Sequence, residues 1–438
     1  MSPTSVVLER ALVGDPGDAV VADDVRVTIA DGVITSVVAG AARTASEPVV
    51  RGLTIPGLAN AHSHVFHRAL RGRTQRGGGS FWTWREQMYD LAARLTPDDL
   101  HELARAAYAE MLAVGITCVG EFHYLHHAPD GRPYDDPNAM GYAVVAAAVE
   151  TGMRITLLDT CYLSSGFGAP VEGAQRRYTD GDADAWAARV DRLELPPSAR
   201  RGAAIHSVRA VPADQLGAVA TASAGGPLHV HLSEQRAENE ACLAATGRTP
   251  TALLDDAGAL GPDTSAVHAT HLTDDDVARL GATRTHACFC PTTERDLGDG
   301  IGPSLALRAA GAPLTLGSDS HAIVDLFEEM RAVELHERLA SERRGHWPAG
   351  ALLEAATSRG HASLGWDDAG RIEVGARADL VVLDTRSIRT AGTGADAHTA
   401  VYAAGGADVL AVMVDGVWRD IDPAGAGARL DAVIGRLL

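Results

Sequence analysis

Short apolar segments alternate with amphipathic helical stretches through the middle of the chain, and each apolar segment ends at a polar residue. Segments of this length are typical of buried strands, and helices between consecutive strands favour parallel pairing. Eight such strands with chemical side chains at their carboxyl ends predict an α/β protein with a (β/α)₈ barrel, whose active site lies at that end. The segments are 53–61 before His62, 116–120 before Glu121, 155–158 before Asp159, 203–205 before His206, 228–230 before His231, 266–267 before His268, 287–289 before Cys290, and 314–317 before Asp319.

The two ends of the chain have a different pattern. Residues 25–29 and 33–38 alternate as strands do around an Asp-Gly turn, and residues 378–383 and 409–414 are apolar strands. Strands at the two ends need partners, and chain ends often lie close together. We therefore predict a small discontinuous β-sandwich domain from residues 1–56 and 376–438, attached to a metal-dependent barrel of residues 57–375.

The composition narrows the possible partners. The formal net charge is −19, and all 38 basic residues are arginine because the chain contains no lysine. Nucleic acids and anionic membrane surfaces need a basic face, so the charge argues against both. The N-terminal segment lacks a basic region and an apolar core, which predicts a cytoplasmic protein. Five scattered cysteines, an odd number, indicate reduced and buried thiols.

Four residues form a candidate metal site. In His62-Ser-His64 two imidazoles stand two positions apart, so on a strand they face the same side. Taken alone, this pair favours a structural or loop role over metal binding. Together with His231 and Asp319 it supplies three nitrogen donors and one carboxylate, a set that suits one divalent ion, with zinc favoured and ferrous iron as the alternative. His229 faces the same side but lies deeper, which favours a packed histidine.

Several motifs resemble the deaminase branch of the amidohydrolase superfamily. The resemblance implies that Asp319 and His268 take and hold the proton of the attacking water, while Glu234 delivers a proton to the leaving nitrogen. Superfamily members with two metals commonly bridge them with a carbamylated lysine, so the absence of lysine favours a single ion. The motifs are Pro56-Gly-Leu-Ala-Asn-Ala-His62-Ser-His64, His231-Leu-Ser-Glu234, His268, Gly317-Ser-Asp319 and the segment 370–383.

Further stretches, namely 80–86, 121–127, 206–210 and 297–301, resemble the formimidoylglutamate deiminases. These enzymes hydrolyse N-formimino-L-glutamate to N-formyl-L-glutamate and ammonia in histidine degradation. The implied partner is a small anionic dicarboxylate, which needs dedicated cations in so acidic a protein. Arg85 and Arg209 are the candidates, because a guanidinium binds a carboxylate through two parallel hydrogen bonds. Tyr124 and His206 would add neutral hydrogen bonds. His67 stands where the resemblance leads us to expect glutamine, and it can still donate to a carboxylate.

Two other functions compete with this hypothesis. Another deaminase of the same branch would act on a nucleobase or nucleoside-like ring, which does not need two arginines. A catalytically silent scaffold would keep the barrel, but such proteins are expected to lose ligands or proton carriers. The complete set of candidate ligands and proton carriers favours an enzyme. A homodimer is expected from the resemblance alone.

Overall fold

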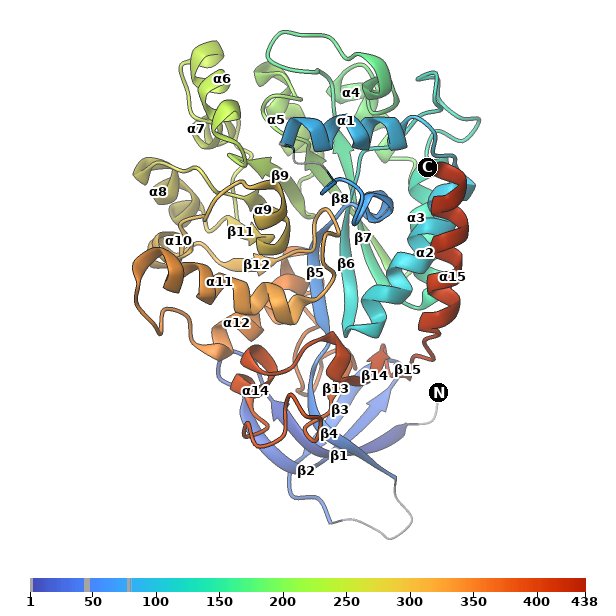
Figure 1. Cartoon of the computed structure of the whole chain (residues 1–438), viewed down its shortest axis with the longest axis vertical. Coiled ribbons are helices and arrows are strands. Elements are labelled where there is room, and N and C mark those ends of the chain that lie inside the picture. Colours follow the sequence, from blue (N-terminus) through green and yellow to red (C-terminus); the bar gives the residue numbers. More distant parts are fainter. Residues whose placement is uncertain (1–2, 43–47, 77–78, 80) are drawn as a thin grey trace.

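The structure, a computed structural model, describes residues 3–42, 48–76, 79 and 81–438, so Ser80 at the start of the aromatic motif lies outside it. Eight parallel strands pair in sequence order (Figure 1). A bridge between Ser63 and Asp319 joins the last strand to the first, with a hydrogen bond of 3.0 Å from Asp319 N to His62 O. The predicted barrel is therefore confirmed. Its strands are β5 (Leu58–Ser63), β6 (Ile116–His123), β7 (Arg154–Cys161), β8 (Ala199–Ile205), β9 (Leu228–Leu232), β10 (Thr264–His268), β11 (His286–Phe289) and β12 (Leu314–Leu316).

The first predicted strand, 53–61, is two strands in the structure. β4 (Val49–Pro56) belongs to the small terminal sheet, and β5 begins the barrel after Gly57. The Gly57 N–H donates to Asp379 O at 2.9 Å, and a Cβ at this position would lie 2.8 Å from the Cβ of Asp379. Glycine thus permits the close approach at which the chain passes from one sheet to the other.

Helices surround the barrel, and α1 lies across the end at which the strands terminate (Figure 1). Several begin with a side-chain cap, such as Thr96, which accepts the N–H of Asp99. The barrel elements are η1 (Val65–Leu70), α1 (Phe81–Ala92), α2 (Pro97–Ala113), α3 (Ala139–Thr151), η2 (Gly173–Arg177), α4 (Ala183–Val190), α5 (Ala213–Ala222), α6 (Arg236–Thr246), α7 (Pro250–Asp256), α8 (Asp274–Thr283), α9 (Pro291–Leu297), α10 (Ser304–Ala310), α11 (Leu326–Ser341), α12 (Ala349–Ala356) and α13 (Ser358–Ser363).

Segments from both ends of the chain share the second sheet, as predicted. It is one hydrogen-bonded sheet of seven strands in the order β15-β14-β13-β4-β1-β2-β3, with β13 antiparallel to β4. The remaining elements are β1 (Thr4–Val13), β2 (Val20–Ala30), β3 (Val33–Val38), β13 (Leu380–Leu383), α14 (Ala397–Tyr402), η3 (Gly406–Asp408), β14 (Val409–Val414), β15 (Val417–Trp418) and α15 (Pro423–Leu437).

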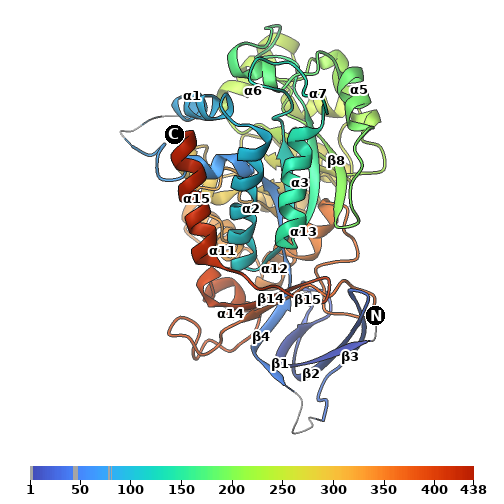
Figure 2. The ribbon, with the colours of Figure 1, turned by 90° about the vertical axis from the view of Figure 1, so that its right-hand side faces the viewer.

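The C-terminal helix leaves this sheet, although the predicted division placed residues 376–438 in the small domain. α15 lies along α2 on the outside of the barrel (Figure 2), and Arg94 Nη1 donates to Leu437 O at 2.8 Å. Its apolar positions, including Leu430 and Val433, are buried. The helix therefore packs against the barrel, because its apolar face is buried there and would not be buried at the edge of the sheet.

The cysteines agree with the expectation of reduced and buried thiols. All five cysteines are buried and free. Within the described ranges, no helix is both long enough and apolar enough to cross a bilayer.

A buried arginine connects the barrel to the small domain. Arg154 on β7 donates to both carboxylate oxygens of Asp379 and, at 2.8 Å, to Asp415 Oδ1. Arg154 and Asp379 are fully buried, and the guanidinium carbon lies 5.1 Å from the centroid of the Trp366 ring. The buried charges of Arg154 and Asp379 therefore compensate each other within this network.

Replacing Arg154 with methionine is expected to destabilise the protein. The substitution keeps much of the side-chain volume but leaves the Asp379 carboxylate buried without a counter-charge, which costs about 3 kcal/mol. Denaturant titration should show a lower unfolding midpoint. The same substitution at exposed Arg132, which pairs only with Asp130, should change the midpoint little. An unchanged midpoint in Arg154→Met would mean that the network does not stabilise the domain junction.

Candidate functional site

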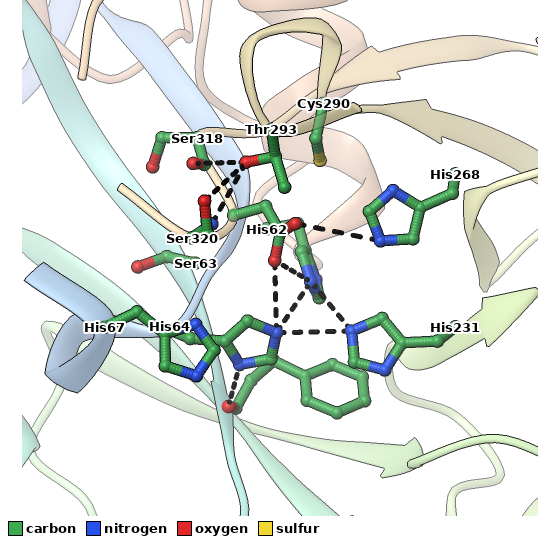
Figure 3. A network of polar contacts seen from close by, with 12 residues as sticks. His62, Ser63, His64, His67, His231, His268, Cys290, Thr293, Ser318 and Ser320 are labelled. Atoms are coloured by element: carbon green, nitrogen blue, oxygen red, sulfur yellow. Dashed lines mark hydrogen bonds and ion pairs between the residues drawn. The ribbon is translucent and has the colours of Figure 1, made fainter. Parts of the chain in front are cut away.

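Three imidazoles and one carboxylate converge at the carboxyl end of the barrel. The Nε2 atoms of His62, His64 and His231 lie 3.1 to 3.2 Å from one another (Figure 3). Asp319 Oδ1 lies 3.3 Å from His62 Nε2 and 3.2 Å from His64 Nε2. The structure therefore brings together all four of the predicted ligands, which come from β5, β9 and the segment after β12.

In His64 and His231, the hydrogen bond made by Nδ1 determines whether Nε2 carries a hydrogen or a lone pair. His64 Nδ1 lies 3.0 Å from Phe122 O, and His231 Nδ1 lies 2.9 Å from His206 O. A carbonyl only accepts, so each Nδ1 carries the hydrogen and each Nε2 presents a lone pair. Burial lowers the pKa of His62 to about 3 despite the opposing effect of Asp319, so this imidazole is also neutral.

This donor set fits a divalent cation. Neighbouring Nε2 lone pairs cannot hydrogen-bond to one another, and together with a carboxylate they surround one point. Four ligands about 2.0 to 2.1 Å from a tetrahedral zinc ion lie about 3.3 Å apart, close to the separations between these atoms. The neutral nitrogen donors and one carboxylate are chemically suited to zinc or a similar ion.

Asp319 is held by the chain around it. A Cβ at Gly317 would lie 2.7 Å from the Cβ of His62, so only glycine lets the segment after β12 approach β5 this closely. Ser318 N donates to Asn60 Oδ1 at 2.9 Å, and Asn60 Nδ2 donates to Ser318 Oγ at 2.7 Å. Asp319 itself has φ +42°, an uncommon value for a non-glycine residue. These contacts fix the carboxylate relative to the histidines.

The buried carboxylate of Glu121 holds the segment that contains His62 and His64 in place. Glu121 accepts hydrogen bonds from Ser63 Oγ at 2.8 Å and from Val65 N at 2.7 Å. Burial raises the pKa of Glu121 to about 8, although these hydrogen bonds oppose the rise. Glu121 was predicted at the end of a strand, and the structure places it outside the ligand cluster as an anchor for the turn after β5.

His268 and Glu234 lie beside the ligand cluster. His268 Nε2 is 3.7 Å from Asp319 Oδ2 and 3.8 Å from Glu234 Oε1, and its Nδ1 is 3.4 Å from Glu294 Oε1. Burial alone would lower the pKa of His268, but Glu234, Glu294 and Asp319 outweigh it and raise the pKa well above the usual value. Burial, assisted by Asp319 and opposed by His268, raises the pKa of Glu234 to about 7. Glu234 can therefore gain and lose a proton near neutral pH.

A pocket extends from the ligand cluster to α1. Its lining includes the predicted substrate residues Arg85, on α1, and Arg209, after β8. Arg85 Nε donates to Tyr89 OH at 2.6 Å, and Arg209 Nη1 donates to Ser165 O at 3.4 Å. Among the described residues, no carboxylate oxygen lies within ion-pair distance of either guanidinium, although the charge of Glu238, in the same pocket, helps to raise the pKa of Arg209. Both guanidiniums therefore have hydrogens that can bind the carboxylates of a ligand.

The other three predicted substrate residues also line this pocket. His67 Nε2 lies 2.8 Å from Tyr124 OH, and the ring of Tyr124 packs edge-on against His206 at 5.3 Å between centroids. Burial lowers the pKa of His67 and of His206 well below the usual value. At neutral pH these three residues therefore offer uncharged hydrogen-bonding groups beside the two arginines.

Asp159 and Cys290 are among the polar residues predicted at strand ends that do not line this pocket. Asp159 pairs with Arg189 at 2.7 Å and accepts from Trp186 Nε1 at 3.0 Å, all three side chains being buried. Cys290 is buried beside Asp319 and His268. His229, the deeper alternative to His231, lies 3.2 Å from Ser363 O and outside the ligand cluster. A polar residue after a barrel strand is thus not by itself a site residue.

The pocket also contains residues that the sequence analysis did not identify. Tyr89 lies one helical turn after Arg85, and Tyr162 follows β7, so both could have been predicted from the sequence to line the pocket. Glu238 lies one turn after Glu234, and its Oε1 is buried with no hydrogen-bond partner in the described ranges. Glu294, in the first turn of α9, contacts His268 from outside the pocket lining, and no feature of the sequence indicated it.

Comparisons with known proteins agree with this geometry. The amidohydrolase family model matches residues 53–419. A formimidoylglutamate deiminase from Pseudomonas aeruginosa is 37% identical over 458 aligned positions, which cover 99% of this chain and 100% of that protein. The crystal structure of an amidohydrolase from Brucella melitensis has a TM-score of 0.91 and 33% identity, covering 99% of both chains. A zinc-bound adenosine deaminase from Xanthomonas campestris has a TM-score of 0.84 and 25% identity over 99% of this chain and 98% of that one.

These similarities extend over the barrel, the terminal sheet and the candidate site together. They confirm the predicted class of enzyme, a hydrolase acting on carbon–nitrogen bonds. The chain belongs to the amidohydrolase family.

Proposed function

We propose that this protein hydrolyses N-formimino-L-glutamate to N-formyl-L-glutamate and ammonia, as a step of histidine degradation in the cytoplasm. The observation that carries the proposal is the pair of guanidinium groups, Arg85 and Arg209, in the pocket that contains the ligand cluster. Similarity over the full length to a formimidoylglutamate deiminase supports the same substrate.

The charges in the pocket favour a dicarboxylate. Other arginines of the protein, such as Arg154 and Arg189, are buried against aspartates, whereas the two pocket arginines contact a phenol and a carbonyl. In a protein of net charge −19, a free dianion needs cations that the protein has not already neutralised. Each charged hydrogen bond contributes about 1.5 to 3 kcal/mol, so two such contacts contribute substantially to affinity.

The candidate ligands would hold one ion, with zinc favoured because the chemistry of the donor set suits it and a structural neighbour binds zinc. When bound, a divalent ion activates water near neutral pH and polarises the carbon under attack. Asp319 Oδ2 would accept the proton of the water, and His268, 3.7 Å away, would stabilise and exchange it. The roles of these residues are part of the proposal.

Glu234 would complete the reaction by protonating the leaving nitrogen. The formimino carbon carries two nitrogens, and expulsion of ammonia requires a proton on the terminal one. Glu234 Oε1 lies 3.8 Å from His268 Nε2, and a pKa near 7 lets the carboxyl group both hold and release a proton. The C–N bond to the terminal nitrogen then breaks, which leaves the formyl group on the glutamate nitrogen.

A deaminase acting on a nucleobase or nucleoside-like ring is the second candidate, since an adenosine deaminase shares the fold at 25% identity. A neutral ring gains nothing from two guanidinium groups, and their desolvation would oppose its binding. The homodimer is a further proposal, based on resemblance alone.

Ammonia release from N-formimino-L-glutamate by purified, metal-analysed protein tests the proposal. The N-formimino derivative of aspartate, guanine and adenosine serve as controls. Turnover of the glutamate compound alone, with about one metal per chain, is expected. Turnover of a ring compound instead would overturn the proposed substrate and leave the family assignment intact.

Replacing Arg209 with methionine is expected to raise KM for N-formimino-L-glutamate by about 10- to 100-fold. The substitution removes a charged carboxylate contact but lies away from the four ligands, so the metal content should not change. Steady-state kinetics and metal analysis check this. Arg248→Met on the surface is the matched control, since Arg248 pairs only with Asp256 outside the pocket. An unchanged KM in Arg209→Met would exclude Arg209 as a carboxylate ligand.

A further inference from the structure

A buried glutamine lies behind the pocket and contacts two of its tyrosines. Gln175 on η2 is 4% exposed, and its Nε2 donates to Tyr89 OH at 3.0 Å and to Tyr162 OH at 2.8 Å. Its Oε1 accepts from Glu172 N at 3.0 Å. Because a backbone N–H only donates, this contact determines the orientation of the amide and turns both amide hydrogens toward the tyrosines.

The two phenols therefore have determined polarity. Tyr89 OH receives hydrogens from Gln175 and from Arg85 Nε, which occupies both of its acceptor positions. The hydroxyl hydrogen of Tyr89 must then point to another acceptor. Tyr162 OH also receives a hydrogen from Gln175, and burial raises its pKa to about 12, which keeps it protonated. The two phenols also hydrogen-bond to each other, and this contact contributes to the raised pKa of Tyr162. Because both acceptor positions of Tyr89 are filled, Tyr89 donates in this contact, Tyr162 accepts, and the hydroxyl hydrogen of Tyr162 is left for a ligand.

Both tyrosines line the same pocket as the two arginines, whereas Gln175 does not. Arg85 is hydrogen-bonded to Tyr89, and the charge of Arg209 lies close enough to Tyr162 to oppose the rise in its pKa. Through the two tyrosines, the amide group of Gln175 on η2 is thus linked to both arginines, which lie on separate segments of the barrel.

We propose that Gln175 is a positioning residue for dicarboxylate binding, which holds Tyr89 against Arg85 and Tyr162 near Arg209, so that the Tyr162 hydroxyl donates to a substrate carboxylate. This inference rests on the proposed function. It assigns Tyr162 as a substrate contact, and it makes the separation of the two carboxylate sites depend on a residue that does not contact the substrate. That separation selects the glutamate over the shorter aspartate derivative.

Two substitutions of Gln175 test the proposal. Gln175→Met keeps the volume and removes both donated hydrogen bonds. Gln175→Glu can keep the contact to Glu172 N, but its other oxygen accepts from the tyrosines and turns the hydroxyl hydrogen of Tyr162 away from the pocket. Each variant is expected to raise KM for N-formimino-L-glutamate by about 10-fold, with kcat within about twofold, because two hydrogen bonds that act on binding are lost. The preference for the glutamate over the aspartate derivative should also fall.

The matched control is Gln215→Met. Gln215 is half-buried, and its Oε1 accepts from Ala183 N at 2.8 Å at the start of α4, outside the pocket. Its KM should equal that of the wild type. A structural role of Gln175 would instead lower kcat and the melting temperature together, which would overturn the proposal.

A combined variant shows whether Gln175 acts through the phenols. In Tyr89→Phe/Tyr162→Phe, KM is expected to rise, and adding Gln175→Met should have no further effect because its hydrogen-bond partners are absent. Additive effects would mean that Gln175 acts by another route and would overturn the proposal.

Binding of N-formyl-L-glutamate, measured by calorimetry, separates this inference from the proposed function. Weaker binding in Gln175→Met, in a protein whose wild type releases no ammonia from the formimino compound, would support the positioning role and overturn the reaction. Turnover by the wild type with unchanged kinetics and binding in Gln175→Met would overturn the positioning role alone. A wild type that neither turns over the substrate nor binds the dicarboxylate would overturn both.

Discussion

Asp319→Asn is expected to reduce kcat for ammonia release by about 10⁴-fold and to lower the bound metal below one ion per chain. The amide keeps the shape of the side chain but removes the anionic ligand at Oδ1 and the proton acceptor at Oδ2, which faces His268 at 3.7 Å. Loss of a general base alone costs about 10²- to 10⁴-fold, and weaker metal binding adds to that cost. Single-turnover ammonia release and metal analysis of the purified variant check both effects.

Asp296→Asn is the matched control for this substitution. Asp296 lies on α9 and accepts from Gln75 Nε2 at 2.9 Å on the surface, so both activity and metal content should be unchanged. If Asp319→Asn loses activity but keeps its full metal content, Asp319 acts as the base and is not a metal ligand. Normal activity would reject both roles.

Glu234→Gln is expected to reduce kcat by about 10³-fold while the metal content stays the same. Glutamine preserves the volume but cannot deliver a proton to the leaving nitrogen, and Glu234 is not one of the four clustered ligands. The pKa of Glu234 is raised to about 7, so the protonated form persists below that pH and is lost above it. If the acid form is required, wild-type kcat should fall as the pH rises through about 7.

The pH profile of kcat distinguishes this role from a structural one. The decline above pH 7 should be absent in Glu234→Gln, because the titrating group has been removed. Glu240→Gln, on the exposed side of α6, should retain the wild-type profile. A Glu234→Gln enzyme with the same decline would show that another group controls it, and Glu234 would lose its assignment as the acid.

The division of the chain was predictable in outline. Alternating apolar segments and helices predicted the barrel, because buried parallel strands must be apolar on both faces and helices must connect them. The boundaries depended on contacts far along the chain. Gly57 separates two strands because Asp379 packs against it, and α15 joins the barrel because α2 covers its apolar face. Neither neighbour can be read from the local pattern.

The apolar pattern and the motifs were thus enough to predict the barrel, the shared terminal sheet and the clustering of the four candidate ligands, since strand ends in a closed parallel barrel all point to one mouth. The motifs also identified both pocket arginines. Which polar strand ends line the pocket, and which form buried ion pairs as Asp159 does, depends on tertiary contacts. The contacts of Gln175 with Tyr89 and Tyr162 could not be predicted from the sequence either. These residues lie on separate segments, and the way in which the loops pack over the barrel leaves no periodic pattern along the chain.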